Sequence, residues 1–234
     1  MPSPSPLHHS GPSLASLFLA IIGVFVALSL SAIAAHAQTP IQVLEASALH
    51  PPAGARVAIV EFADLQCPAC AAANPALKAA VAQYKIPWVR HDFLISYHNW
   101  SRNAAINARW LDLKSKSLGD DYRDQVFAAQ ASIYNPDSLN QFTLKFAQSH
   151  GITVPFAIDP QGKLANDIDA DIALGKRVGI SSTPTIFIVT AGGKGAPYTQ
   201  VLKPAQDLYT TIDRAIADTA PAPKSAVAKA ASAK

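Results

Sequence analysis

The sequence is poor in cysteine and in charge. Only two of its 234 residues are Cys, and 15% are charged. A small scaffold built on disulfides normally has several well-separated cysteines, so this class of protein is excluded. The two cysteines, Cys67 and Cys70, are three positions apart, and a bond across so short a loop constrains the unfolded chain very little. We therefore interpret the pair as a reactive site.

Basic residues are also few, and they are scattered. The formal net charge is +3 at pH 7, and the 19 Lys and Arg residues form no run longer than Lys176-Arg177. A protein that binds nucleic acid usually concentrates its basic residues in one patch or stripe. The sequence therefore predicts no nucleic-acid partner. Its length and its 50% hydrophobic content predict one globular domain with terminal extensions.

The beginning of the chain has no Lys or Arg before Arg56. Residues 14–35 form an uncharged, mostly apolar run, and Ala35-His36-Ala37 after it matches a signal-peptidase site. We predict that residues 1–37 are a signal peptide. Because the run is long enough to span a bilayer, a retained membrane anchor is the alternative. Both place the rest of the chain in the periplasm or another extracytoplasmic space, where disulfides persist.

The remaining sequence alternates between strand and helix patterns. Ser138 with Gln141 matches a capping box at a helix start, and Ile106, Trp110 and Leu113 mark one apolar helix face. The patterns predict an edge strand at 41–44, strands at 57–62, 86–95, 185–189 and 198–202, and helices at 68–85, 106–113, 122–127, 138–150, 164–178 and 204–217. We expect the 86–95 strand to lie in the core.

This order of elements predicts an α/β fold, with a mixed central sheet flanked by helices on both faces. The domain is expected to span residues 38–218, with a helical insertion at about 99–160. Residues 219–234 are dominated by Ala, Pro, Lys and Ser, and they contain no aromatic residue. We predict that they are a disordered tail.

The two cysteines lie where the predicted 57–62 strand leads into the 68–85 helix. A helix N-terminus has unpaired N–H groups and a partial positive charge, which favour a thiolate and lower its pKa. A thiolate is the attacking species in disulfide exchange. The pattern therefore predicts Cys67 as the nucleophile and Cys70, one helical turn later, as the resolving thiol.

Further residues are expected around this pair. Glu61 lies six positions before Cys67 on a buried strand, where its carboxyl group can exchange a proton with Cys70. Thr183 and Pro184 directly precede another strand, where a cis proline would hold an extended loop against the cysteines. We predict catalytic roles for Cys67, Cys70, Glu61 and Pro184, and substrate contacts for Thr183, Pro68 and Ala69.

No cofactor and no metal are predicted. The main competing interpretation of the cysteine pair is half of a zinc site, which normally needs four ligands. The chain has no second cysteine pair, and only scattered histidines such as His91 and His98 are available. An inert buried disulfide is the other alternative.

Together these motifs resemble the thioredoxin superfamily. The matching residues are Val60-Glu61-Phe62, Cys67-Pro68-Ala69-Cys70, Pro75 and Ser182-Thr183-Pro184-Thr185. The helices between the second strand and the Thr-Pro strand are similar to the DsbA-like branch, as is the stretch with His91-Asp92-Phe93-Leu94, His98 and Ala104-Ala105. The similarity covers about residues 55–218.

The resemblance implies a thioredoxin fold with a helical insertion. It also implies that Cys67 is the exposed nucleophile, Cys70 its buried partner, Glu61 the buried acid and Pro184 the cis proline. Ala69 departs from the strongly oxidising members, which have a histidine there that stabilises the thiolate. We therefore expect a reduction potential between the extremes of the superfamily, about −270 and about −120 mV. Gln66 replaces an aromatic residue that often precedes the first cysteine.

The sequence thus predicts an exported thiol–disulfide oxidoreductase that forms or rearranges disulfides. Its expected partners are cysteine-containing exported proteins and, by resemblance, a membrane redox protein that regenerates it. One alternative is an exported or anchored reductase, for example in cytochrome c maturation. Another is a thioredoxin-fold binding protein without turnover.

Overall fold

The computed structural model describes residues 39–220. The predicted signal segment (residues 1–37) and residues 221–234 of the predicted tail lie outside this range. In chain order the elements are η1 (Ala46–Ala48), β1 (Val57–Ala63), α2 (Pro68–Tyr84), β2 (Trp88–Asp92), α3 (Ser101–Asp112), α4 (Lys116–Ala129), η2 (Gln130–Ser132), α5 (Pro136–Ser149), α6 (Lys163–Val178), β3 (Thr185–Thr190), β4 (Tyr198–Val201) and α7 (Pro204–Asp218), where η marks a 3-10 helix.

The four strands form one mixed sheet in the order β2-β1-β3-β4. Strand β1 pairs with β2 in parallel and with β3 in antiparallel, and β3 pairs with β4 in antiparallel. In this register Glu61 of β1 lies between Arg90 of β2 and Ile186 of β3. The predicted mixed α/β sheet is confirmed.

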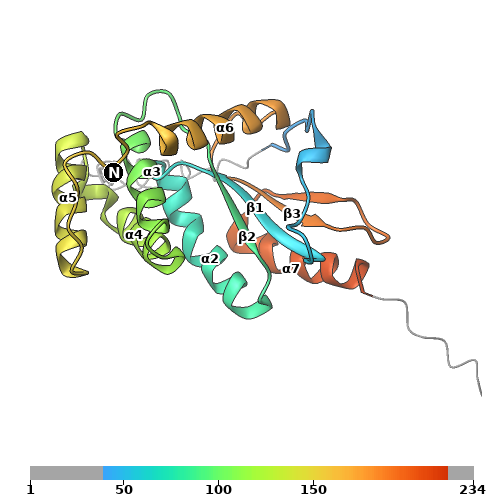
Figure 1. Ribbon diagram of the computed structural model, residues 1–234. Coiled ribbons are helices and arrows are strands. Elements are labelled where there is room, and N and C mark those ends of the chain that lie inside the picture. The colour runs from blue at the N-terminus through green and yellow to red at the C-terminus, as the bar shows by residue number, and fades with distance from the viewer. Residues whose placement is uncertain (1–38, 221–234) are drawn as a thin grey trace, which may run out of the picture. The chain divides into compact units, whose positions relative to one another are not determined.

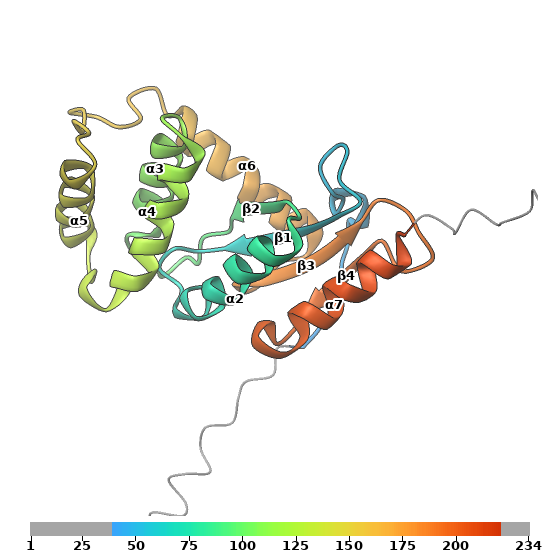
Figure 2. The ribbon, with the colours of Figure 1, turned by 90° about the horizontal axis from the view of Figure 1, so that it is seen from below.

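Helices cover both faces of the sheet, as predicted (Figure 1). One face packs against α2 and α7, and the other packs against α6, because successive strand side chains point to opposite faces. Figure 2 shows the first face, with α2 and α7 in front of the sheet. The buried residues are Val57, Ile59, Ala73, Leu77, Ala80, Ile186, Ile188, Val201, Leu208, Ile212 and Ala215 on the first face, and Leu49, Ala58, Val60, Phe62, Phe93, Val178, Ile180, Phe187 and Val189 on the second.

The helices α3, α4 and α5 gather beside one end of the sheet around a core of their own (Figure 2). Trp100 and Trp110, which their apolar character places in a core, are buried there. Leu65, two residues before Cys67, belongs to the same cluster. The helical insertion is therefore packed directly against the segment that leads into the cysteine pair.

Two strand predictions were wrong in detail. Residues 41–44 form no strand: the Leu44 amide donates to the Val178 carbonyl at the end of α6 (3.0 Å), and the Ile41 amide donates to the Gln200 side chain (2.8 Å). Strand β2 is shorter than 86–95 and lies at the edge of the sheet, where all its residues are only half-buried.

Helix starts were also predicted too late. The capping box of α5 is formed by Asn135 and Ser138, not by Ser138 and Gln141: the Asn135 side chain accepts from the Ser138 amide, and the Ser138 hydroxyl accepts from the Asn135 amide. Helix α4 begins at Lys116, after Ser115 caps it. Leu113 lies beyond the end of α3 and is 74% exposed, so it does not belong to the apolar face.

None of the helices within residues 39–220 combines the length and apolar character needed to cross a membrane.

Candidate active site

Cys67 is the N-cap residue of α2, with an extended backbone (φ −79°, ψ 120°), and Pro68 is the first helical residue. Proline is well suited to this position because the first amides of a helix have no partner within the helix. The Cys67 thiol is 8% exposed and lies 3.3 Å from the carbonyl oxygen of Thr183. Pro68 and Ala69 are exposed, so this end of α2 is open to a reaction partner.

The two thiols are free, and their pKa values are shifted in opposite directions. A hydrogen bond from the Cys70 thiol is the main cause that lowers the pKa of Cys67 to about 6, and the amides of Cys70 and Ala69 add to it. Burial raises the pKa of Cys70 well above its ordinary value, and the neighbouring Cys67 and Glu61 raise it further. At neutral pH the site therefore contains one thiolate, on Cys67, and one thiol, on Cys70.

The loop before β3 lies against this thiolate. The Thr183–Pro184 peptide bond is cis, the geometry that the family resemblance implies. The Thr183 hydroxyl is buried and has no hydrogen-bond partner among the described residues. It contributes to lowering the pKa of Cys67. The Thr183 carbonyl thus accepts from the Cys67 thiol, and the Thr183 side chain favours the ionised form of the sulfur.

Glu61 lies beneath the cysteines on the face of β1 that α2 covers, because it alternates with Val60 and shares the side of Ile59. Its side chain is 3% exposed. Burial raises the pKa of Glu61 to about 7, against the opposing effects of the Arg90 charge and a hydrogen bond from Trp88. A carboxyl group with this pKa can both accept and donate a proton near neutral pH.

Polar side chains hold the turn between β1 and α2 in place. The buried carboxylate of Asp64 accepts hydrogen bonds from the Gln66 amide, the Ile95 amide and His98 Nδ1, each at 2.8 Å. Gln66, in turn, accepts from the Trp100 amide (2.8 Å) through its side-chain oxygen. The position that departs from the family pattern is therefore used to join the turn to the start of α3.

Gln130 of η2 makes a second connection to this turn. Its side-chain amide donates to the carbonyl oxygens of Leu65 (2.8 Å) and Cys67 (3.1 Å). Sequence reasoning missed Gln130, which lies 63 residues after Cys67, and it missed Trp88 and Asp64. The only available signal was for Asp64, an acid directly after a buried strand.

The two histidines considered as zinc ligands have other partners. His91 Nδ1 pairs with Asp171 at 2.7 Å, and His98 Nδ1 pairs with Asp64 at 2.8 Å. Within residues 39–220 no group of three or more His, Cys, Asp or Glu side chains is arranged to hold a metal ion.

Comparison with known proteins places this arrangement in a family. A family model described as thioredoxin matches residues 52–194, which is more than half of the chain and includes both cysteines and Pro184. The chain belongs to the thioredoxin family. A search of the curated proteins by sequence found no match.

Solved structures share the thioredoxin fold of this chain with its helical insertion. The thiol-disulfide exchange protein alpha-DsbA2 from Wolbachia pipientis has a TM-score of 0.56 and 18% identity, over 70% of this chain and 84% of that one. BdbD from Bacillus subtilis has a TM-score of 0.56 and 16% identity, over 76% and 97%. A periplasmic thioredoxin-like protein from Salmonella enterica serovar Typhimurium has a TM-score of 0.57 and 19% identity, over 76% and 99%. The predicted fold class is confirmed.

Proposed function

We propose that this chain is a thiol–disulfide oxidoreductase whose redox pair is Cys67 and Cys70. The observation that carries the proposal is the asymmetry of the pair: the pKa of Cys67 is lowered to about 6, whereas that of Cys70 is raised well above its ordinary value. A stabilised thiolate is both a ready nucleophile and a good leaving group in disulfide exchange. The alpha-DsbA2 protein, which shares the fold, is described as a thiol-disulfide exchange protein.

The oxidising direction starts from the Cys67–Cys70 disulfide. A substrate thiolate attacks the Cys67 sulfur, the bond to Cys70 breaks, and a mixed disulfide forms. The departing Cys70 thiolate takes a proton, for which Glu61 is placed. A second substrate thiolate then attacks the substrate sulfur of the mixed disulfide and expels the Cys67 thiolate. The substrate loses two electrons and gains a disulfide, and the protein pair is reduced.

Roles for the surrounding residues follow from this scheme. The Thr183 carbonyl accepts from the Cys67 thiol, so Thr183 and the adjacent Pro184 would guide an extended substrate strand. The exposed Pro68 and Ala69 would contact the substrate on the other side. The reaction needs no cofactor, but a membrane redox partner would have to reoxidise the pair.

We also propose that the segment 1–37 exports or anchors the domain formed by residues 38–218, and that cysteine-containing exported proteins are its substrates.

The reduction potential distinguishes an oxidase from a reductase. Thioredoxin has a nucleophilic cysteine with a pKa of about 7, and DsbA has one of about 3.5, so the pKa of Cys67 lies between the two. A more stable thiolate favours the reduced form, so we expect a potential between about −270 and −120 mV. A redox titration that gives either extreme contradicts this expectation.

Activity is tested by insulin reduction with dithiothreitol as the electron donor. The wild-type chain should accelerate the reaction, and Cys67→Ser should reduce the acceleration to background. A Cys70→Ser variant should accumulate mixed disulfides through Cys67, and mass spectrometry would identify the trapped proteins. Equal activity of wild type and Cys67→Ser would refute the catalytic role and leave only a binding protein.

A further inference from the structure

A cavity of about 260 Å³ lies beside Glu61, away from the exposed face of the cysteine pair. Its walls come from β1, β2, α3, α4 and α6. The cavity therefore lies where the helical insertion meets the edge of the sheet. Its lining includes the side chains that touch Glu61 and set its electrostatic environment.

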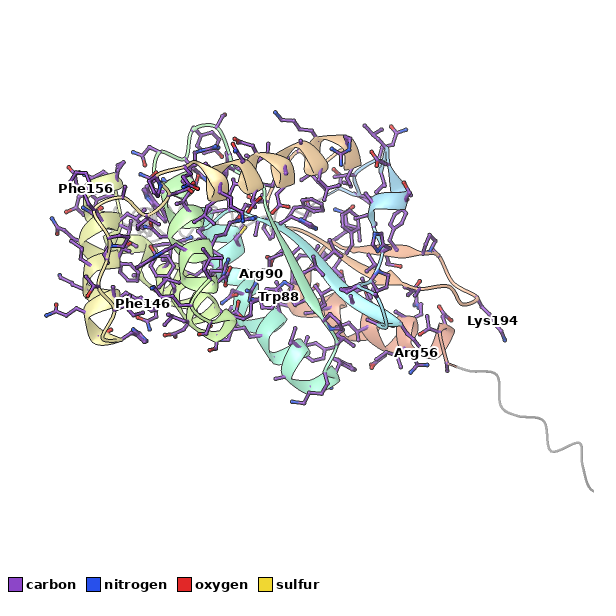
Figure 3. The ribbon with its side chains drawn as sticks, in the orientation of Figure 1. Arg56, Trp88, Arg90, Phe146, Phe156 and Lys194 are labelled. Atoms are coloured by element: carbon purple, nitrogen blue, oxygen red, sulfur yellow. The ribbon has the colours of Figure 1, made fainter. Side chains whose placement is uncertain are left out.

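Two residues of β2 contact or face the Glu61 carboxyl group. The indole N–H of Trp88 donates a hydrogen bond to Glu61 Oε2 at 3.0 Å. The guanidinium carbon of Arg90 lies 3.7 Å from the centre of the Trp88 ring, a cation–π distance. Figure 3 labels both side chains between β2 and α4. The stacked guanidinium limits the rotation of the Trp88 indole. The indole N–H in turn fixes the position of the Glu61 carboxyl group through its hydrogen bond.

The helical insertion holds this stack in place. Arg90 forms an ion pair with Asp120 of α4, and Lys116 and Arg123, from the same helix, also approach Asp120. The side chain of Arg90 is 20% exposed, so its charge is only partly screened by solvent. A displacement of α4 would therefore move the charge that acts most strongly on Glu61.

The other charged groups around the cavity are mostly paired with one another. Arg109 of α3 pairs with Asp92 of β2 and Asp171 of α6, and Asp171 also pairs with His91. Arg123 of α4 pairs with Asp112 of α3. From α2, Cys67 and Cys70 interact electrostatically with Glu61. Among these groups only Arg90 stacks on the side chain that is hydrogen-bonded to Glu61.

We propose that Trp88 and Arg90 are positioning residues for the buried acid: their contacts hold the Glu61 carboxylate and set how readily it accepts a proton from Cys70. The hydrogen bond and the positive charge both favour the ionised carboxylate, so both oppose the effect of burial. Without them Glu61 stays protonated at neutral pH and cannot act as a base. The kinetic consequence depends on the proposed redox function, but the effect on Glu61 itself does not.

The direct test measures the protonation of Glu61 by carbon-13 NMR of its carboxyl group between pH 4 and 10. It uses a Cys67→Ala/Cys70→Ala background, so that no thiol titrates with the acid and no redox activity is needed. Trp88→Phe keeps the aromatic ring under Arg90 but removes the N–H donor. Since a hydrogen bond to a charged group is lost, we expect a roughly tenfold increase in the proton affinity of Glu61.

The role of the Arg90 charge is tested with two variants in the same cysteine-free background. Arg90→Gln removes the charge and should also raise the proton affinity of Glu61, by severalfold or more. Arg90→Lys retains the charge but loses the planar stack on Trp88, so its effect should be smaller than that of Arg90→Gln. The control is Trp110→Phe, which alters another buried tryptophan, one with Lys114 over its ring, in the core of the insertion. It should leave the Glu61 titration unchanged.

A change of less than twofold in either Trp88→Phe or Arg90→Gln overturns the proposal, provided that circular dichroism shows both variants folded. A second measurement is the pH profile of insulin reduction with both cysteines present. The acid limb should move to higher pH in Trp88→Phe and Arg90→Gln, but not in Trp110→Phe. If the chain reduces no insulin, the proposed function fails while the NMR titration still decides the role of Trp88 and Arg90.

Discussion

At the scale of single residues, a substitution of Thr183 tests how the Cys67 thiolate is stabilised. Thr183→Val keeps the shape of the side chain and the backbone carbonyl, but it removes the hydroxyl. Because this hydroxyl contributes to lowering the pKa of Cys67, its loss should raise that pKa above about 6. A hydrogen bond to a charged group corresponds to about a tenfold change in acid dissociation. The rate of Cys67 alkylation as a function of pH measures the effect.

Thr185→Val, at the start of β3 next to this loop, is the matched control. Thr185 is buried, and its hydroxyl donates to the carbonyl of Ser182 at 2.8 Å rather than to the sulfur. Its replacement should lower stability without moving the alkylation profile of Cys67. The same displacement of the profile in both variants would show that the loop acts through packing and not through the Thr183 hydroxyl.

At the scale of elements, Gln130 connects the insertion to the start of α2. Gln130→Met keeps the length of the side chain but leaves the carbonyl of Leu65 without its donor, whereas that of Cys67 still accepts from the Ala71 amide (3.2 Å). We expect a loss of about 1–3 kcal/mol in the free energy of unfolding, measured by urea denaturation. Hydrogen exchange should also increase in the turn between β1 and α2.

The control for Gln130 is Gln125→Met in α4. Gln125 is exposed, and its side-chain amide donates a hydrogen bond to Asp121 of the same helix. Its replacement should change stability by less than about 0.5 kcal/mol. An equal loss in the two variants would show that Gln130 contributes nothing specific to the turn.

The elements also show what sequence patterns can predict. Strand β1, helix α2 and helix α6 were predicted closely, because local patterns determine them: an apolar run, a proline at the first helical position, and Gly179 at the end of α6. The start of α5 was missed because both Asn135 and Ser138 are good caps, and only the backbone geometry selects Asn135. Residues 41–44 alternate like a strand, but the Ile41 amide bonds to a side chain and the Leu44 amide bonds to the end of α6, so the segment pairs with neither edge strand.

The candidate site was predictable only in part. The strand-to-helix junction predicts that Glu61, Cys67 and Cys70 belong to one site, and the resemblance to the thioredoxin superfamily adds Thr183-Pro184. Trp88 and Gln130 depend on long-range packing, namely the register of β2 on β1 and the position of η2 under the turn. No local pattern encodes either relation, so sequence reasoning could not find them.

At the scale of the whole molecule, Glu61 makes stability depend on pH. Burial raises its pKa from 4.5 to about 7, so its contribution to stability is fully present below about pH 4.5 and is lost as the pH rises through about 7. Glu61→Gln cannot ionise but can still accept the hydrogen bond from Trp88. The variant should therefore be more stable than its parent above pH 7, by about 3 kcal/mol.

Urea denaturation at several pH values measures this difference. Both chains should carry Cys67→Ala and Cys70→Ala, so that the thiols do not contribute to the pH dependence. The two stabilities should converge near pH 4.5 and separate as the pH rises. A constant difference between pH 4.5 and pH 8 would mean that Glu61 titrates at its ordinary value.

The whole account depends on the Cys67 sulfur being an anion at neutral pH. The most direct measurement is the rate at which iodoacetamide alkylates Cys67 in the reduced wild-type chain between pH 4 and 10, with mass spectrometry to separate Cys67 from Cys70. The account predicts a half-maximal rate near pH 6. A half-maximal rate near pH 9, the value of an ordinary thiol, would contradict it.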